Sequence, residues 1–236
     1  MKKILAALLI LAIAVAVVSE IVFPRVVTSI LKEQIAKSTH AQDIALHINS
    51  VPNAKLVAGY VDKIYATANN ADIGDLNFQA LTLNGEKLNI DISEIISPTQ
   101  NLNDKQRADK ILKSAQHVEL SGIITEEGLK NFVEGKVDEM KSANIKITPQ
   151  EVTATGQFKV LGRMADVDIA GNFMLIGEDI YFRATRLDVR NTLVRNVQLD
   201  RYLGDIKVLE SSQLPIGLKF SSVQMNDGEI LITATR

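Results

Sequence analysis

The clearest pattern in this sequence is the alternation of apolar and polar residues in VTATGQFKV, residues 152–160, and in ADVDIAGNFMLIGEDIYFRA, residues 165–184. In the second stretch, Asp166 and Asp168 lie on the face opposite the apolar residues. Successive side chains of a β-strand point to opposite faces, so this period of two predicts strands with one apolar and one solvated face. Gly-Glu-Asp at residues 177–179 predicts a tight turn between two antiparallel strands.

The same alternation extends outward from this region toward both ends of the chain. Strands are predicted at residues 64–68, 75–83 and 87–92, with Asn84-Gly85 as a hairpin turn. Another hairpin is predicted near the C-terminus, where Asn-Asp-Gly at residues 226–228 separates two alternating segments. Because short turns join successive strands, we predict a curved antiparallel meander.

Three segments show the 3.6-residue period of amphipathic helices. They are residues 24–39, residues 104–116 and residues 125–140, and Thr125 is a candidate N-cap for the last one. The sequence therefore predicts an α+β fold, in which a few amphipathic helices pack on a curved antiparallel sheet. Either the helices cover the apolar face of the sheet, or the sheet curls over a cavity.

The N-terminus has the pattern of an export segment. Lys2 and Lys3 precede fifteen apolar residues without a charge, residues 4–18. This run spans roughly 22 Å and needs the following residues to cross a hydrocarbon core of roughly 30 Å. We predict an uncleaved membrane-anchor helix over residues 1–23, with a cleaved signal as the alternative, and a single domain over residues 24–236. The positive-inside rule then predicts a single-pass cell-membrane protein whose body lies on the extracytoplasmic side, periplasmic or cell-wall.

Composition excludes several classes of function. The formal net charge is −2, and nucleic-acid binding usually needs a basic surface. The chain has no Trp and only 5% aromatic residues, which argues against base-stacking platforms, so we predict no nucleic-acid partner. It also has no Cys, which removes disulfides, thiolate metal sites and a cysteine nucleophile.

The sequence contains no pattern typical of catalysis. His40, His47 and His117 have no metal-ligand spacing, and no nucleophile elbow, P-loop or dinucleotide fingerprint occurs. Asp166 and Asp168 share one strand face, where solvated carboxylates are a simpler interpretation than an acid–base pair. We therefore predict no metal, no cofactor and no enzyme activity, and an enzyme acting on envelope lipid or glycan is the third interpretation.

Arginines gather in one region of the C-terminal half. They are Arg183, Arg186, Arg190, Arg195 and Arg201, and Asp188, Asp200 and Asp205 are interleaved with them. Such a stretch can receive a phosphate, but local pairing with the aspartates is the simpler interpretation.

Several short motifs resemble those of the LmeA-like phospholipid-binding family. Members tend to end with an LP-x-G-L segment and a D-G hairpin, and this chain has LPIGLKF at residues 214–220 and NDGEI at residues 226–230. IITEEGL at residues 123–129 resembles the family's strand-to-helix junction, and ITP at residues 147–149 resembles the start of the strand that follows. IYATA at residues 64–68 is similar to the first sheet segment of the family.

The order and spacing of these motifs extend the resemblance over most of the body. One departure is Gly128, where a residue that favours helices is expected. The resemblance implies a bacterial cell-envelope protein that binds phospholipid in a curved cradle of sheet and helices, akin to tubular lipid-binding domains. It supplies no catalytic residue.

We therefore predict a membrane-anchored envelope protein whose apolar sheet face holds phospholipid acyl chains. The candidate lipid contacts are the large apolar residues on strand faces, Phe158, Ile169, Phe173 and Phe182. For each of them, an ordinary place in the core beneath the helices is the alternative. The alternative function is a structural or scaffolding protein that has a fully packed interior and no ligand.

Overall fold

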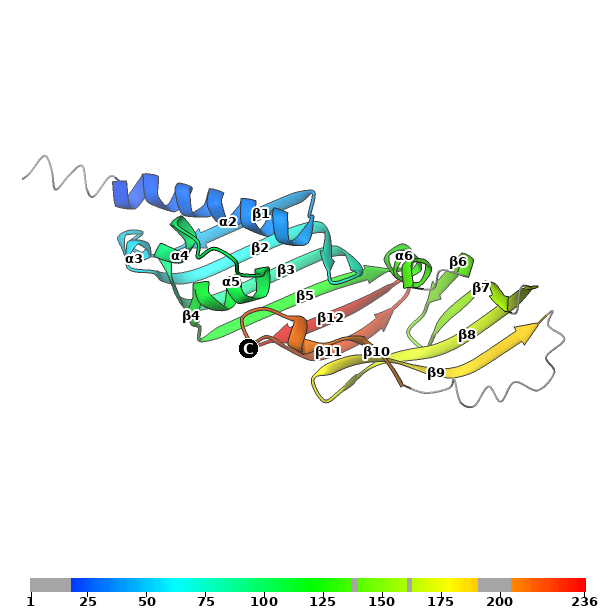
Figure 1. The fold of residues 1–236 in the computed structure, drawn as a ribbon. Helices are drawn as coiled ribbons and strands as arrows, with labels where there is room; N and C mark the ends of the chain where they lie inside the picture. The colour runs from blue at the N-terminus through cyan, green and yellow to red at the C-terminus, as the bar shows by residue number, and fades with distance from the viewer. Residues whose placement is uncertain (1–17, 137–139, 161–162, 191–204) are drawn as a thin grey trace, which may run out of the picture.

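The structure is a computed structural model that describes residues 18–136, 140–160, 163–190 and 205–236. It contains a seven-stranded antiparallel sheet, here called the large sheet, and a five-stranded antiparallel sheet, the small sheet (Figure 1). The large sheet is formed by β1 (Asp43–Asn49), β2 (Tyr60–Ile73), β3 (Leu76–Ile90), β4 (Leu112–Ser114), β5 (His117–Thr125), β11 (Lys219–Asn226) and β12 (Glu229–Thr235). Its strand order is β1-β2-β3-β5-β12-β11, and β4 pairs with β3.

The small sheet is a simple meander. It contains β6 (Met140–Ile147), β7 (Val152–Val160), β8 (Arg163–Ile176), β9 (Asp179–Arg190) and β10 (Asp205–Leu209), paired in that order. The chain leaves the large sheet after β5, forms the small sheet, and returns to the large sheet as β11 and β12. The α+β class with antiparallel sheets is confirmed, but the strands form two sheets rather than one.

Helices cover one face of the large sheet. The helical elements are η1 (Val18–Val22), α2 (Phe23–Thr39), α3 (Ala54–Val57), α4 (Ile92–Ile96), α5 (Asp104–Ile111), α6 (Glu126–Lys136) and η3 (Ser211–Gln213). Figure 1 shows α2, α4 and α5 over this sheet, and α6 where the two sheets meet. The helix predicted to end at residue 116 ends at Ile111, because the next three residues pair with β3 as β4.

Most of the predicted membrane anchor lies outside the described residues, which begin at Val18. Within the described ranges, no helix has both the length and the apolar character needed to cross a membrane. The contacts of the body nevertheless reach back to Glu20. Its carboxylate accepts hydrogen bonds from the backbone N–H groups of Asn53 and Ala54, each at 3.0 Å, at the start of α3.

The predicted hairpin turn at Asn84-Gly85 is wrong, because β3 runs without interruption through both residues. The turn lies instead at Gly74, whose φ of +62° is a conformation that favours glycine. Gly85 has a different role in the large sheet. A Cβ atom there would lie 2.7 Å from Cγ2 of Ile64, so the glycine makes room for a neighbouring strand's side chain.

Two other predicted turns are confirmed. Gly177 separates β8 from β9 with a φ of +64°, and Gly228 separates β11 from β12 with a φ of +80°. Both residues adopt the left-handed backbone region, where a side chain is strained. In these hairpins the turn chemistry in the sequence was sufficient to locate the chain reversal.

The junction between β5 and α6 explains why the chain starts a second sheet. The Thr125 hydroxyl accepts a hydrogen bond from the Gly128 N–H at 3.2 Å, which makes it the predicted N-cap. The Glu126 carboxylate accepts a hydrogen bond from the Ile147 N–H at 2.9 Å, which fixes the end of β6 against the start of α6. Because the helix begins directly at the end of β5, β6 is directed away from the large sheet.

Gly128 is required by close packing at this junction. A Cβ atom there would lie 2.7 Å from the carbonyl oxygen of Asn77. We expect Gly128→Ala to destabilise the protein, because about 1–3 kcal/mol of overpacking exceeds the helix-propensity gain of about 1 kcal/mol. The measurement is the free energy of unfolding by urea.

Gly135→Ala is the matched control in the same helix. No atom lies within 4 Å of a Cβ at Gly135, so this variant gains propensity without a clash. We expect it to be as stable as the wild type or slightly more stable. Equal stabilisation by both substitutions would contradict the close packing at Gly128.

Candidate functional site

An apolar cavity of about 710 Å³ lies between the large sheet and the segments that cover it. Its floor is the sheet face formed by β1, β2, β3 and β5, and its other walls are α2, α5 and the segment that precedes β11. This volume is in the range of pockets that enclose small organic ligands. The helices therefore cover the sheet without filling the space above it.

The floor of the cavity is almost entirely aliphatic because the strands alternate apolar and polar residues. The floor residues are Ile44, Leu46, Ile48, Val61, Ile64, Ala66, Ala68, Leu81, Leu83, Leu88, Ile90, Val118 and Leu120. Within each regular stretch of a strand, the period of two places the apolar residues on the same side of the sheet. The walls add apolar residues from the covering segments, including Ile30, Leu31, Ile35, Ala108, Ile111 and Ile216.

Several of these large side chains are only half-buried. Ile44, Ile48, Ile64, Leu83 and Leu120 all belong to the sheet face that the helices cover, yet each keeps part of its surface exposed. A closely packed core would bury such residues completely. Their exposure therefore reflects the cavity, and it leaves apolar surface available to a ligand.

A local change in backbone conformation lets both halves of β3 contribute to the floor. Leu81 and Leu83 have odd numbers and Leu88 and Ile90 have even numbers, yet all four line the cavity. Lys87, which lies between the two pairs, has a φ of +50°. This left-handed residue shifts the alternation by one position, so the apolar face continues to the end of the strand.

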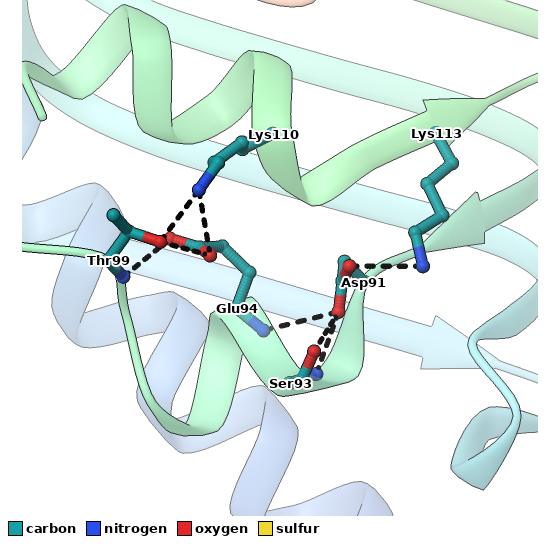
Figure 2. A network of polar contacts seen from close by, with 6 residues as sticks. All are labelled: Asp91, Ser93, Glu94, Thr99, Lys110 and Lys113. Atoms are coloured by element: carbon teal, nitrogen blue, oxygen red, sulfur yellow. Dashed lines mark hydrogen bonds and ion pairs between the residues drawn. The ribbon is translucent and has the colours of Figure 1, made fainter.

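A network of polar contacts holds α4 and α5 at one end of the cavity (Figure 2). Asp91 is the N-cap of α4 and accepts hydrogen bonds from the backbone N–H groups of Ser93, at 3.0 Å, and Glu94, at 3.3 Å. The Ser93 hydroxyl donates to the same carboxylate, and Lys113 of β4 forms an ion pair with it at 3.0 Å. The Ser93 and Lys113 contacts hold the pKa of Asp91 well below its usual range.

Glu94 forms the second half of this network. Its carboxylate accepts hydrogen bonds from the Thr99 N–H at 2.7 Å and from the Thr99 hydroxyl at 2.8 Å. Lys110 of α5 donates to the Thr99 hydroxyl at 2.7 Å and lies 3.7 Å from the carboxylate. The bonds from Thr99 lower the pKa of Glu94. Together the contacts join α4 to α5, and they position Pro98, which lines the cavity.

The segment before β11 forms another wall and is attached to α5. Lys105 donates a hydrogen bond to the carbonyl oxygen of Ser212, and the Ile216 N–H donates to the Asp109 carboxylate. Ile216 and Gly217 both have positive φ values, 54° and 70°. The LPIGL motif thus forms a segment with two residues in the left-handed backbone region, and Pro215, Ile216 and Leu218 of this segment line the cavity wall.

The four residues predicted to contact lipid lie on strands of the small sheet, and Ile169, Phe173 and Phe182 do not line the cavity. Phe173 and Phe182 are cross-strand neighbours whose ring centroids are 5.3 Å apart, and Phe173 is buried. Ile169 is half-buried on β8, and Phe158 pairs through its backbone with Ala165 on β8. The structure brings the two rings together, and contact of the four residues with lipid stays a prediction.

Sequence analysis missed the residues that form the cavity. The only available indication was that the apolar faces predicted for residues 24–39 and for the strands near residues 64–83 had to meet somewhere. Periodicity shows that two faces are apolar, but it does not show whether they touch. The distance between them is set by the covering helices and their polar contacts, which are not encoded locally.

The charged residues noted in the C-terminal half form local ion pairs. Arg183 makes a bidentate pair with Asp205, at 2.6 and 2.8 Å. Asp168 lies 3.9 Å from Arg186 and 3.5 Å from Arg190. Arg186 also lies 3.8 Å from Asp188, so pairing with the interleaved aspartates is confirmed for Arg183 and Arg186. Arg190 pairs instead with Asp168 of the neighbouring strand, and Arg195 and Arg201 lie outside the described residues.

The histidines do not form a metal site in the described part of the chain. His47 stacks on Tyr65 with ring centroids 6.5 Å apart, and His40 lies 3.8 Å from a carboxylate oxygen of Asp72. Across the described ranges, no three His, Asp or Glu side chains gather in a way that could hold a metal ion. The candidate site is therefore the apolar cavity, and its surface is suited to hydrocarbon.

Comparison with known families agrees with this geometry. The model of the LmeA-like phospholipid-binding family matches residues 18–235, which is nearly the whole described chain. The protein belongs to the LmeA-like phospholipid-binding family. Searches of curated proteins and of solved structures gave no significant match.

The family assignment confirms the resemblance inferred from the sequence motifs. The family is described by phospholipid binding and not by an enzyme activity. Acyl chains are aliphatic, as is the floor of the cavity in this LmeA-like chain. The Gly128 departure is explained by the close approach of Asn77 described above.

The polar network of α4 makes a prediction about pH. Because folding lowers the pKa values of Asp91 and Glu94, protonation favours the unfolded state. The stabilisation from Glu94 is complete above its ordinary pKa of 4.5 and is lost as the pH falls below that value. We expect Glu94→Gln to lower the melting temperature at pH 7. Between pH 5 and pH 3, the melting temperature of this variant should fall less than that of the wild type, as measured by circular dichroism.

Glu86→Gln is the control for this experiment. Glu86 forms an exposed ion pair with Lys63 at 3.2 Å, and exposed pairs contribute little to stability. We expect this variant to keep the melting temperature and acid profile of the wild type. Indistinguishable profiles for Glu94→Gln and the wild type would show that the network does not stabilise the fold.

Proposed function

We propose that this protein is a membrane-anchored, extracytoplasmic phospholipid-binding protein that holds acyl chains in the cavity above the large sheet and catalyses no reaction. The observation that carries the proposal is an aliphatic cavity of about 710 Å³ in a member of a phospholipid-binding family. The protein would act as a lipid cradle or carrier in the cell envelope. A scaffolding protein without a ligand is the alternative, but the cavity favours lipid.

The energetics of such a cavity suit an acyl chain. Burial of one methylene group contributes about 0.8 kcal/mol, so ten methylene groups contribute roughly 8 kcal/mol before ordering costs. Half-buried residues such as Ile64 and Leu83 already present apolar surface to the cavity. Contact with hydrocarbon would complete their burial without a change in the fold.

Filling the cavity should displace the lipid. Ala66 is a buried residue of the floor, so we expect Ala66→Trp to place an indole in the space that the acyl chains occupy. The full-length protein is purified in detergent and washed, and bound phospholipid is extracted and quantified by mass spectrometry. We expect near-stoichiometric phospholipid in the wild type and at least about a tenfold reduction in Ala66→Trp.

Ala45→Trp is the matched control, because Ala45 is on β1 between two floor residues, Ile44 and Leu46, and does not line the cavity. We expect it to retain phospholipid at the wild-type level. Thermal melting of both variants checks that they are folded. Equal phospholipid in all three proteins would place the lipid elsewhere, and its absence from the wild type would favour the scaffold.

Exposed apolar residues at one end of the body support membrane attachment there. This apolar tip consists of Val18, Ile21, Val22, Val26, Val51, Val57, Tyr60 and Ile96, whose exposed fractions are between 44% and 68%. They belong to η1, the start of α2, α3 with its flanks, and α4, which lie together at one end in Figure 1. Exposed apolar side chains gathered at one end of a molecule are typical of protein or membrane interaction sites.

The position of the apolar tip favours a lipid bilayer as its partner. The apolar run of residues 4–18 enters the body at Val18, which is itself a member of the tip. The Glu20 bonds to Asn53 and Ala54 hold η1 against α3, so the tip is a fixed surface. Ile96 is two residues from Pro98, which lines the cavity, so a membrane at the tip would lie close to one end of the cavity.

The absence of cysteine allows a direct test of this orientation. A single Cys introduced by Val57→Cys is the only thiol in the chain and can carry an environment-sensitive fluorophore. In full-length protein reconstituted into phospholipid vesicles, we expect its emission to shift to the blue and to be quenched by spin-labelled lipids. The physical reason is that the label at Val57 would enter the interfacial region of the bilayer.

Ile206→Cys is the control, since Ile206 is equally exposed but lies on β10 of the small sheet. We expect a label at Ile206 to show the emission of an aqueous environment and no quenching by lipid. Similar quenching at both positions, or at neither, would contradict attachment through the apolar tip.

A further inference from the structure

Among the described residues, five charged side chains line the largely apolar cavity, and four of them already have a partner in the protein. Glu33 and Lys37 form an ion pair with each other at 2.7 Å. Asp72 accepts a hydrogen bond from the Asn77 side chain at 2.8 Å, and Lys105 donates to the Ser212 carbonyl oxygen. Each of these four side chains therefore has a partner in the protein.

Arg107 of α5 is the exception among the charged lining residues. Its guanidinium makes no hydrogen bond or ion pair with any side chain of the described part of the chain, and its Nε atom is buried without an acceptor. A buried donor without a partner costs free energy, and the cost is larger for a charged group. An arginine that lines a ligand cavity in this state is available for an anionic group of the ligand.

We propose that Arg107 binds the phosphate of the phospholipid whose acyl chains occupy the cavity. This assignment rests on the proposed function and deepens it, because it names the group that would distinguish a phospholipid from a neutral lipid. The guanidinium presents several N–H donors in a planar fork that fits two phosphate oxygens at once. The buried Nε–H would then have an acceptor.

The surroundings of Arg107 increase the effect of this contact. Ala108 and Ile111 of the same helix line the cavity beside it, and apolar neighbours reduce the screening of a charge pair by water. Two hydrogen bonds hold α5 in place, one from Lys110 to the Thr99 hydroxyl and one from the Ile216 N–H to the Asp109 carboxylate. Arg107 is therefore positioned by a helix that is anchored to its neighbours. The cavity would therefore select its lipid through one ionic contact as well as through chain burial.

The test compares two lipids that differ by the phosphate group. Full-length protein in detergent is titrated with radiolabelled phosphatidic acid and with diacylglycerol of the same acyl chains. We expect the wild type to prefer phosphatidic acid by at least about tenfold, and Arg107→Gln to lose this preference while still binding diacylglycerol. Arg107→Lys, which keeps the charge but not the fork, should retain part of the preference. Arg25→Gln, an exposed arginine outside the cavity, should retain all of it.

The outcomes separate this assignment from the proposed function. If both lipids bind and Arg107→Gln keeps the wild-type preference, the assignment to Arg107 is overturned and lipid binding stands. If the wild type binds neither lipid, the proposed function fails as well. Inorganic phosphate is the third arm, and competition by it at concentrations as low as those of phosphatidic acid would overturn the headgroup assignment in favour of free phosphate.

Discussion

The arrangement of the cavity wall depends on the buried carboxylate of Glu94, whose two oxygens both accept hydrogen bonds. Glu94 joins the loop after α4 to the network through Thr99, and Lys110 extends that network to α5. These directional polar bonds hold α4, the loop after it and α5 in place relative to one another, whereas apolar contact alone would favour closer packing. The aliphatic floor supplies the surface for a ligand. The polar network of α4 and α5 keeps that surface accessible, because it holds the two covering helices in place.

Sequence periodicity predicted a large part of this structure. The hairpins at Gly177 and Gly228, the N-cap at Thr125 and the α+β class all follow from local chemistry that the structure retains. The split into two sheets did not follow, because a period of two identifies the face of a strand and not its partner. The false turn at Gly85 has a related cause, since a glycine can serve side-chain packing as well as chain reversal.

The candidate site was harder to predict than the fold. Hydropathy gives the same weight to an isoleucine that is packed in a core and to one that faces a cavity, so Ile64 had no distinguishing feature. The large aromatic residues of the small sheet were more conspicuous, although they lie away from the cavity. Arg107 was similarly inconspicuous, because the lack of a partner is a property of three-dimensional surroundings. The LPIGL motif was noted only as a family feature, and the structure gives it a physical role as a wall of the cavity.

The return of the chain to the large sheet has a consequence for how the protein forms. β12 pairs along its full length with β5, although more than a hundred residues separate the two strands in the sequence. During synthesis, β5 has an unpaired edge until the C-terminal strands have been made, and contacts of such high sequence separation form slowly. The large sheet is therefore completed last, and a chain shortened by its final hairpin would keep a bare strand edge beside the cavity floor. The wall segment that leads into β11 is added in the same late step, so an incomplete chain would lack both the closing strands and one side of the lipid site.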